Sequence, residues 1–394
     1  ILRKGLPKSL KRPNDLTILS IVPLLHKYDE PMSGISSVLL PAANVSLENT
    51  ITYNPSLFSF DDKLILAPMQ GLTSLFFRKA YHECFPGCID YAISPFISVT
   101  DGLITSKSRK FRDVFPFENK NSLEVVPQLL GSTSQGIISY GAILQELGYR
   151  QFNINCACPA KCAIKHGRGS ALLKDLKRFD GFLNDIFKNV HQAVSIKIRI
   201  GFDSKADIAS LADLINAYPL KYVVIHPRLA VNLYQGSPDY EAFGFLAERL
   251  QCRVVYNGDI FSLDDFLQVK QRFPMIKDFM LGRGILQNPL LAAEIRGLHF
   301  DKNMLKTLFF KLEDYYLKLF LEVGETERPF GETERRFDKT KGRFILPDRQ
   351  DKIAKALSDK MKELCKYMFG NNFSSIAEAE SLSELNAIVT RMFL

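Results

Sequence analysis

The run VSIKIRIG (194–201), followed one helix length later by YVVIHPR (222–228), decides the fold. Each is a short, continuous apolar run rich in Val and Ile, as expected of a parallel strand buried on both faces. The stretch between them has the spacing of an amphipathic helix. The same unit recurs at intervals of roughly thirty residues, in the runs LILAPMQ (64–70), YAISPF (91–96), VVPQLLG (125–131), FNINCACP (152–159), RVVYNGD (253–259) and DFMLGRG (278–284).

Eight strand–helix units in succession predict a (β/α)8 barrel, an α/β fold whose active sites lie at the C-terminal ends of the strands. Polar side chains occupy this end in seven of the eight runs. Chemistry from seven strands would converge on one cavity, which indicates an enzyme. These side chains are Gln70, Gln128, Asn155 with Cys158, Lys197 with Arg199, His226 with Arg228, Asn257 with Asp259, and Arg283.

The chain divides into three predicted parts: an N-terminal extension (1–61), the barrel (62–300) and an α-helical domain (301–394). The extension has the order of regions of a signal peptide, although a partly ordered segment packed on the barrel is the interpretation that we favour. Because the sequence begins with Ile, Met32 is an alternative start. Beyond the barrel, two long amphipathic patterns without intervening strands predict helices. The near-repeat GETERPF–GETERRF (324–337) between them is interpreted as a charged loop.

The composition predicts an anionic partner. A net charge of +8 and an isoelectric point near 9.0 favour nucleic acid. Basic side chains gather in the loop 101–120 and in residues 335–366, as either a solvated surface or one that follows phosphates. No apolar run has the roughly eighteen residues that cross a bilayer, so no membrane association is predicted. The odd number of cysteines, seven, favours a reducing compartment, the cytoplasm.

Cysteines crowd the end of the fourth run, in the segment INCACPAKC (154–162). Pro159 would end the strand and expose the thiol of Cys158 at the barrel mouth. Such a thiol suits a nucleophile or an acid that delivers its proton to carbon. A buried structural thiol and a zinc site are the alternatives. The spacing departs from the usual Cys-x2-Cys pattern of zinc sites, so no metal is predicted; the zinc ligands would be Cys156, Cys158, Cys162 and His166.

Lys197 and Arg199 alternate with Ile in the fifth run and so point to the same side of the strand. Two cations in a barrel core are costly unless an anion meets them. The pattern therefore predicts a bound anion near the strand end, with an ion pair to Asp259 as the structural alternative.

The last two runs end in NGD (257–259) and GRG (282–284). Loops after these strands of a (β/α)8 barrel often form a phosphate site from backbone N–H groups. The glycines would let the backbone approach the phosphate, and Arg283 would add charge. Gln128 and His226 are placed to hydrogen-bond a heterocycle above it, with a histidine satisfied within the core as the alternative for His226.

Taken in order, these motifs resemble those of the tRNA-dihydrouridine synthases, flavin enzymes that reduce a uracil ring in tRNA. The resemblance covers about residues 62–300 and rests on APMQGLTSLFFR, PQLLGS, NCACPAK with GSALL, IKIRIG, IHPR with YQG, NGDI and GRGILQNP. It implies an FMN-binding barrel that uses NADPH and, less specifically, a helical domain that binds tRNA. We expect the protein to be a monomer when it binds tRNA.

The resemblance implies a role for each matching residue. FMN contacts are expected from Pro68, Met69, Gln70, Gln128, Lys197, His226, Asn257, Gly258, Asp259, Gly282 and Arg283. Substrate contacts are expected from Asn155, Arg199 and Arg228. Reduced flavin would pass hydride from N5 to C6 of a flipped-out uracil, and Cys158 would protonate C5. The NCACPAK segment favours a D-loop uridine near position 16 as the target.

Three departures from the family pattern concern local contacts rather than the reaction class. Ala157 replaces a usual Gly, HPRL (226–229) replaces His-Gly-Arg-Thr, and YAISPF lacks the usual Glu at its end. Two alternative functions stay open. One is a flavin barrel that reduces a free pyrimidine or another activated C=C bond; the other is a non-catalytic RNA-binding protein on a decayed barrel, against which the retained Lys197, Cys158 and Arg283 argue.

Overall fold

The computed structural model describes residues 62–326 apart from 101, 103 and 206, together with 336–338, 343–345, 349–368 and 373–392. The predicted N-terminal extension (1–61) lies outside the described residues, as does the middle of the GETER near-repeat (327–335). Residues 324–326, which begin that near-repeat, end a long helix instead of forming a loop. Glu is a good helix former, so the preceding helix continues into the repeat.

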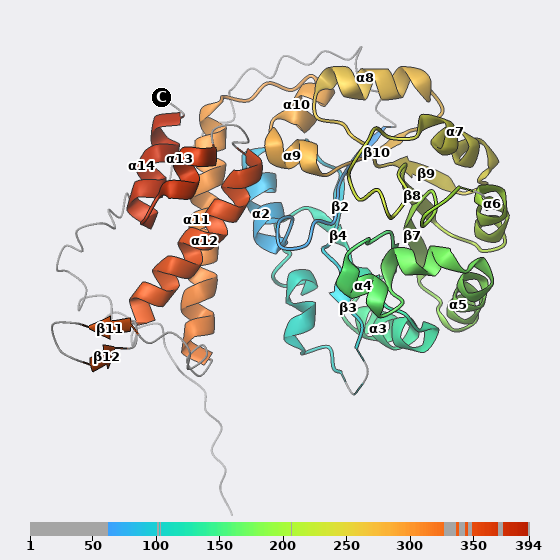
Figure 1. Cartoon of the computed structure of the whole chain (residues 1–394), viewed down its shortest axis with the longest axis horizontal. Coiled ribbons are helices and arrows are strands. Elements are labelled where there is room, and N and C mark those ends of the chain that lie inside the picture. The colour runs from blue at the N-terminus through green and yellow to red at the C-terminus, as the bar shows by residue number, and fades with distance from the viewer. Residues whose placement is uncertain are drawn as a thin grey trace, which may run out of the picture. The chain divides into compact units, whose positions relative to one another are not determined.

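Parallel strands form the barrel that the sequence predicts (Figure 1). Six predicted runs each give one strand, namely β1 (Lys63–Leu66), β6 (Gln151–Cys156), β7 (Ala193–Arg199), β8 (Tyr222–His226), β9 (Arg253–Tyr256) and β10 (Asp278–Leu281). The second run gives two pieces, β2 (Tyr91–Ile93) and β3 (Ile97–Ser98), and so does the third, with β4 (Glu124–Val126) and β5 (Gln128–Leu130). β1 pairs with both β10 and β2, while β2 pairs with β4 and β3 with β5. The ring of eight strand positions therefore closes.

Prolines explain both interruptions. Pro127 separates β4 from β5, and Pro95 lies between β2 and β3. Proline has no N–H to donate, so a ladder of hydrogen bonds breaks where it occurs. The carbonyl of Pro127 still accepts a hydrogen bond of 2.8 Å from the backbone N–H of Asn153. The two pieces of each strand thus keep one position in the barrel.

Helices surround the strands (Figure 1). The predicted crossovers are present as α2 (Leu75–Cys84), α3 (Ser134–Glu146), α5 (Leu176–Asn189), α6 (Ile208–Asn216), α7 (Tyr240–Arg249), α8 (Leu263–Arg272) and α10 (Leu291–Arg296), with the short helices α4 (Lys161–Lys165) and α9 (Arg283–Gln287) and the 3₁₀ helix η4 (Gly169–Lys174). Local caps define several starts: Ser262 and Asp265 form a capping box on α8. The predicted loop after strand two contains a 3₁₀ helix, η3 (Arg109–Val114), whose Phe111 and Val114 are buried.

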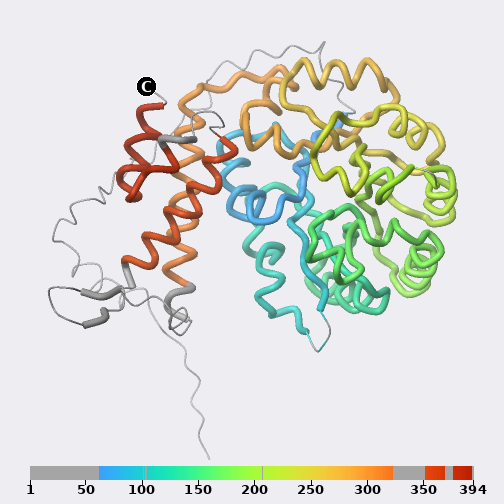
Figure 2. Tube along the Cα trace, viewed as in Figure 1, coloured from blue at the N-terminus to red at the C-terminus, as the bar shows by residue number. Residues whose placement is uncertain are grey.

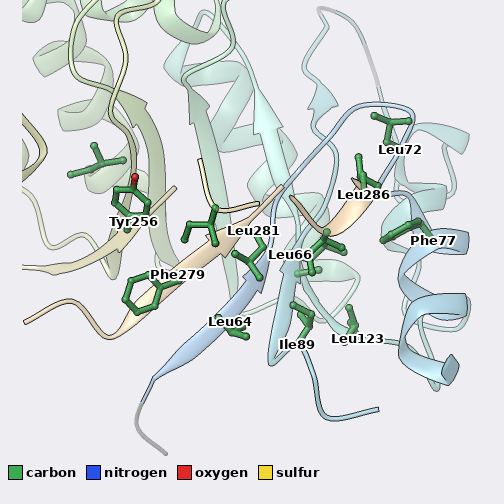
Figure 3. Close-up of a cluster of buried hydrophobic side chains, with 14 of the residues drawn as sticks. Leu64, Leu66, Leu72, Phe77, Ile89, Leu123, Tyr256, Phe279, Leu281 and Leu286 are labelled. Atoms are coloured by element: carbon green, nitrogen blue, oxygen red, sulfur yellow. The ribbon is translucent and has the colours of Figure 1, made fainter. Parts of the chain in front are cut away.

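The core has two layers because neighbouring strand residues face opposite sides. Leu64 and Leu66 of β1 pack outward, in a cluster that also contains Phe77 of α2 (Figure 3). Ile65 and Ala67 belong to a second cluster, with Met280 and other residues of the strands. The first cluster joins the strands to the helices, and the second fills the barrel below the strand ends.

Further helices follow the barrel, namely α11 (Asn303–Thr326), α12 (Arg349–Met368), α13 (Phe373–Glu378) and α14 (Leu382–Met392). α11 packs on α2, and α12 packs on α11 and α9 (Figure 2). An antiparallel hairpin of β11 (Arg336–Asp338) and β12 (Arg343–Ile345) lies between α11 and α12 in the sequence. The expectation of a segment without strands is therefore wrong, since strands this short give no readable alternation. None of the described helices is long and apolar enough to span a membrane. The division into domains at residue 301 stays a prediction.

Candidate active site

A cavity of about 340 Å³ opens where the strands end. Seven of the eight strand positions supply lining residues, and α12 adds Tyr367. Most of the site residues expected from the sequence line it together: Pro68, Met69, Gln70, Asn155, Cys158, Lys197, Arg199, His226, Asn257, Gly258, Asp259, Gly282 and Arg283. Gln128 and Arg228 are the two expected residues that do not line the cavity.

A chain of amide hydrogen bonds fixes the loop that carries Cys158. The Oδ1 atom of Asn155 accepts from the backbone N–H groups of Ala157 (3.1 Å) and Cys158 (2.8 Å). Asn155 in turn donates through Nδ2 to Oε1 of Gln128 (2.9 Å), and Gln128 donates to Oδ1 of Asn153 (2.7 Å). The side chain of Gln128 is fully buried, so it supports the loop from below instead of facing the cavity.

The next segment holds Cys158 from its other side. The carbonyl of Cys158 accepts from both the N–H (3.1 Å) and the hydroxyl (3.0 Å) of Ser170. Gly169 has a φ of +61, and a Cβ built there would lie 2.7 Å from that carbonyl oxygen. Only glycine accepts both this conformation and this approach. The motif GSALL therefore acts as a clamp on the cysteine.

The Cys158 thiol is half-buried at the cavity. Burial raises its pKa, while Arg199 and Lys197 act in the opposite direction. A thiol with a raised pKa keeps its proton at neutral pH, as a proton donor must. The other cysteines nearby are placed differently, with Cys156 buried and Cys162 exposed. Among the described residues no three His, Cys, Asp or Glu side chains lie where they could hold a metal ion, so the alternative zinc ligands do not come together.

Lys197 and Arg199 both reach the cavity from β7, as their alternation predicts. Burial, together with the Arg199 charge, lowers the pKa of Lys197 to about 7, and no carboxylate contributes to the shift. Burial likewise lowers the pKa of Arg199 to about 10. Arg199 donates to three backbone carbonyls, those of Ala157, Leu229 and Leu233. Neither cation forms the ion pair with Asp259 that was the structural alternative.

Asp259 instead joins two other arginines. Arg228 donates to its two carboxylate oxygens at 3.0 and 2.5 Å, and Arg283 donates to Oδ1 at 2.6 Å. Arg228 is buried and also bonds the carbonyls of Gln235 and Gly236. It therefore lies behind Asp259 and can act on a ligand only through that carboxylate. Arg283 itself lines the cavity.

His226 presents one unsatisfied nitrogen. Its Nδ1 lies 2.6 Å from the carbonyl of Asn257 and must donate, since a carbonyl only accepts. Burial together with Lys197 lowers the pKa of His226 well below its usual value, so the ring is neutral and, with its proton on Nδ1, leaves Nε2 bare. Nε2 is buried and has no hydrogen-bond partner among the described residues. This argues against the alternative of a satisfied core histidine, because a ligand N–H or O–H is needed to complete it.

The glycines of the last two strand ends are required mainly by the fold. A Cβ on Gly284 would lie 2.0 Å from the carbonyl oxygen of Ile260, and one on Gly258 would lie 2.0 Å from the hydroxyl of Tyr256. Gly282 is less confined, with Ala67 at 3.3 Å. The close packing of the loops after β9 and β10 thus explains Gly258 and Gly284 without any ligand.

A family model described as Dihydrouridine synthase (Dus) matches residues 65–329. The chain belongs to the dihydrouridine synthase family. The predicted resemblance and the prediction of an enzyme are thereby confirmed.

Related synthases come from several bacteria. A probable tRNA-dihydrouridine synthase of Helicobacter pylori is 30% identical over 238 residues, which cover 59% of this chain and 70% of that protein. A tRNA-dihydrouridine(16) synthase of Aquipseudomonas alcaligenes is 27% identical, with 60% and 76% of the two chains covered. Similar solved structures include morphinone reductase, at a TM-score of 0.44 and 11% identity over 62% of this chain and 88% of that one. An old yellow enzyme homologue from Zymomonas mobilis has a TM-score of 0.44 and 10% identity, with 62% and 92% covered.

The departures from the family pattern are accommodated locally. Ala157 is not among the residues with positive φ, so no glycine is required before Cys158. The carbonyl of Pro227 accepts from the N–H of Asp239 at 2.7 Å, which ties down the loop after β8 despite the missing donor. Phe96 lies between β2 and β3 and lines the cavity, in the segment for which the resemblance led us to expect Glu.

Four aromatic residues at the cavity were not predicted as site residues: Phe96, Tyr234, Phe261 and Tyr367. Tyr234 belongs to the YQG motif, which was a usable signal. Its ring lies under the guanidinium of Arg283 (4.5 Å) and near Arg199 (5.7 Å), and it meets His226 edge-on. Tyr367 comes from α12, far along the chain, and no local pattern marks it.

Proposed function

We propose that the protein uses FMN and NADPH to reduce a uridine in the D-loop of tRNA, at or near position 16, to 5,6-dihydrouridine. Family membership supports the reaction class. The relatives named tRNA-dihydrouridine(16) synthase support the position. The observation that carries the proposal is the cavity itself, in which a protonated thiol, buried cations and an unsatisfied histidine nitrogen face the same space.

The residues at the cavity fit a flavin. Lys197 is a partly buried lysine at the cavity that would meet the electron-rich side of a reduced ring, and His226 Nε2 would complete its hydrogen bonding on the ligand. Arg283 and the backbone at Asn257 and Gly282 would hold the phosphate. When bound, FMN supplies the hydride that is added to C6 of the uracil.

Cys158 would deliver the proton to C5. Burial keeps the thiol protonated, and the clamps at Asn155 and Ser170 fix the direction of its side chain. Asn155 lines the cavity and uses one of the two N–H bonds of its amide on Gln128. Its second N–H is free among the described residues to bind a carbonyl of the base.

Gln128 then contributes by positioning Asn155, which differs from the direct FMN contact that the resemblance implies. Arg199 would fix the Cys158 loop through the Ala157 carbonyl and present its charge to the substrate. Arg228 would act by holding Asp259. Binding of tRNA as a monomer and a location in the cytoplasm are parts of the same proposal.

Two variants test this function. Cys158→Ala should keep the visible flavin absorbance and the oxidation of NADPH but lose most dihydrouridine formation. Lys197→Met should instead weaken flavin retention. Full dihydrouridine formation by Cys158→Ala would remove that residue as the acid. A wild-type protein that stays colourless with added FMN would contradict the whole proposal and favour a decayed barrel, and turnover of free uracil without affinity for tRNA would favour the free-pyrimidine alternative.

A further inference from the structure

Among the described residues beyond the barrel, one side chain lines the cavity, that of Tyr367 of α12. We propose that Tyr367 is a substrate-specificity residue on which a base of the bound tRNA stacks, at the target uridine or next to it. This inference rests on the proposed function, because it presumes a nucleic-acid substrate. It adds a contact from α12 to the residues that the barrel provides.

Hydrogen bonds and packing hold the face of α12 that carries Tyr367 against the loop at the cavity entrance. Lys360 donates to the carbonyl of Gly71 at 2.5 Å, directly after the lining residue Gln70. Glu363 lies beside Gly71 and accepts from Lys360 at 2.6 Å. Residues three and four apart share one face of a helix, so Lys360, Glu363 and Tyr367 lie along the same edge. α12 also packs on α9, which begins at Arg283.

The ring of Tyr367 is available, whereas that of Tyr234 is engaged. Tyr234 already contacts Arg283, Arg199 and His226. Tyr367 is only partly buried: it packs in part against the hydrophobic core but forms no aromatic pair or cation–π contact with another described residue. An available aromatic face at the entrance of a nucleotide cavity suits stacking on a base, which is a frequent mode of recognition for unstacked nucleotides.

The absence of tryptophan from the chain allows a direct test. Tyr367→Trp would place a single tryptophan at the proposed contact, and Phe245→Trp on the crossover helix α7 would serve as the matched control. With FMN bound in both proteins, saturating tRNA should change the emission of Tyr367→Trp and leave that of Phe245→Trp unchanged. Equal responses in the two proteins would overturn the inference.

Kinetics give an independent readout. Tyr367→Ala should raise KM for tRNA on the order of tenfold with little change in kcat, because stacking is lost equally from the bound substrate and the transition state. Tyr367→Phe should restore KM, and flavin content should stay at the wild-type level in both variants. Loss of flavin from Tyr367→Ala, or an unchanged KM, would refute the stacking role. Failure of the wild type to form dihydrouridine would instead refute the proposed function.

Discussion

The close contact of Gly169 with the Cys158 carbonyl predicts that substitution of this glycine lowers catalytic activity as well as stability, whereas substitution of a nearby glycine lowers stability alone. In Gly169→Ala the new Cβ would meet the carbonyl oxygen of Cys158 at 2.7 Å and its Cβ at 2.9 Å. Backbone at Cys158 must therefore move by some tenths of an ångström. A left-handed alanine also costs about 1–2 kcal/mol of stability. Gly167→Ala is the matched control, since Gly167 has nearly the same φ (+64) but its nearest atoms belong to the flexible guanidinium of Arg178.

Both variants should thus lose about 1–2 kcal/mol, a fall in Tm of a few degrees in thermal unfolding followed by circular dichroism. Only Gly169→Ala should also lower kcat for dihydrouridine formation, by roughly tenfold, because displacements near 1 Å in a reacting group can cost about a hundredfold. Flavin absorbance should remain in both. If the two variants lose kcat equally, the clamp does not set the position of the cysteine and the reasoning fails.

Three further outcomes follow from the contacts. The pKa of Lys197 is lowered from 10.5 to about 7 in the folded protein, so the unfolded state binds more protons between these two pH values. The free energy of unfolding, measured with urea on flavin-free protein, should therefore contain a contribution that rises with pH over this window by up to about 1.4 kcal/mol per pH unit. Lys197→Met should remove this contribution. Gln128→Leu removes the partner of one buried atom in each of two amides, Oδ1 of Asn153 and Nδ2 of Asn155, and should lower the free energy of unfolding by about 1–3 kcal/mol and also lower kcat; an unchanged kcat would show that Gln128 does not position the Cys158 loop. Lys362 donates to carbonyls at Ala377 and Ala379, so Lys362→Met should lower Tm. Lys366 is exposed on the same helix, so Lys366→Glu should reduce tRNA affinity and its salt dependence in filter binding without lowering Tm; a lowered Tm with unchanged tRNA binding would make Lys366 a structural residue.

The barrel was predictable because each buried parallel strand has a recognisable sequence pattern, a continuous apolar run, and these runs recur at regular intervals. The proline interruptions were also visible in the sequence, at Pro95 and Pro127, but a pattern cannot say that the chain resumes the same strand position afterwards. That depends on pairing with neighbouring strands, as in β3 with β5. The hairpin of β11 and β12 is too short for any periodicity.

The site was predictable to the extent that strand ends determine it. Alternation gave the direction of Lys197 and Arg199, whereas the other residues were assigned by their position at a strand end and by the family resemblance. The sequence does not determine which side chains form ion pairs, because several cations compete for one carboxylate. Asp259 pairs with Arg228 and Arg283 and leaves Lys197 without it. Gln128 likewise points to the cavity by position but is taken up by Asn153 and Asn155.

The two cations that alternate with Ile in β7 favour an anionic ligand in the cavity. Lys197 and Arg199 seemed costly in the sequence, and the fold does not remove that cost, since burial lowers the pKa of both. Arg199 is offset by carbonyl dipoles and the Tyr234 ring, and Asp259, which brings the one carboxylate among the described residues that line the cavity, is shared between two other arginines. The folded protein therefore keeps an excess of buried positive charge that an anion would relieve. In the proposed function, a flavin would bring its electron-rich reduced ring to Lys197 and its phosphate to Arg283, and the anionic tRNA would meet Arg199.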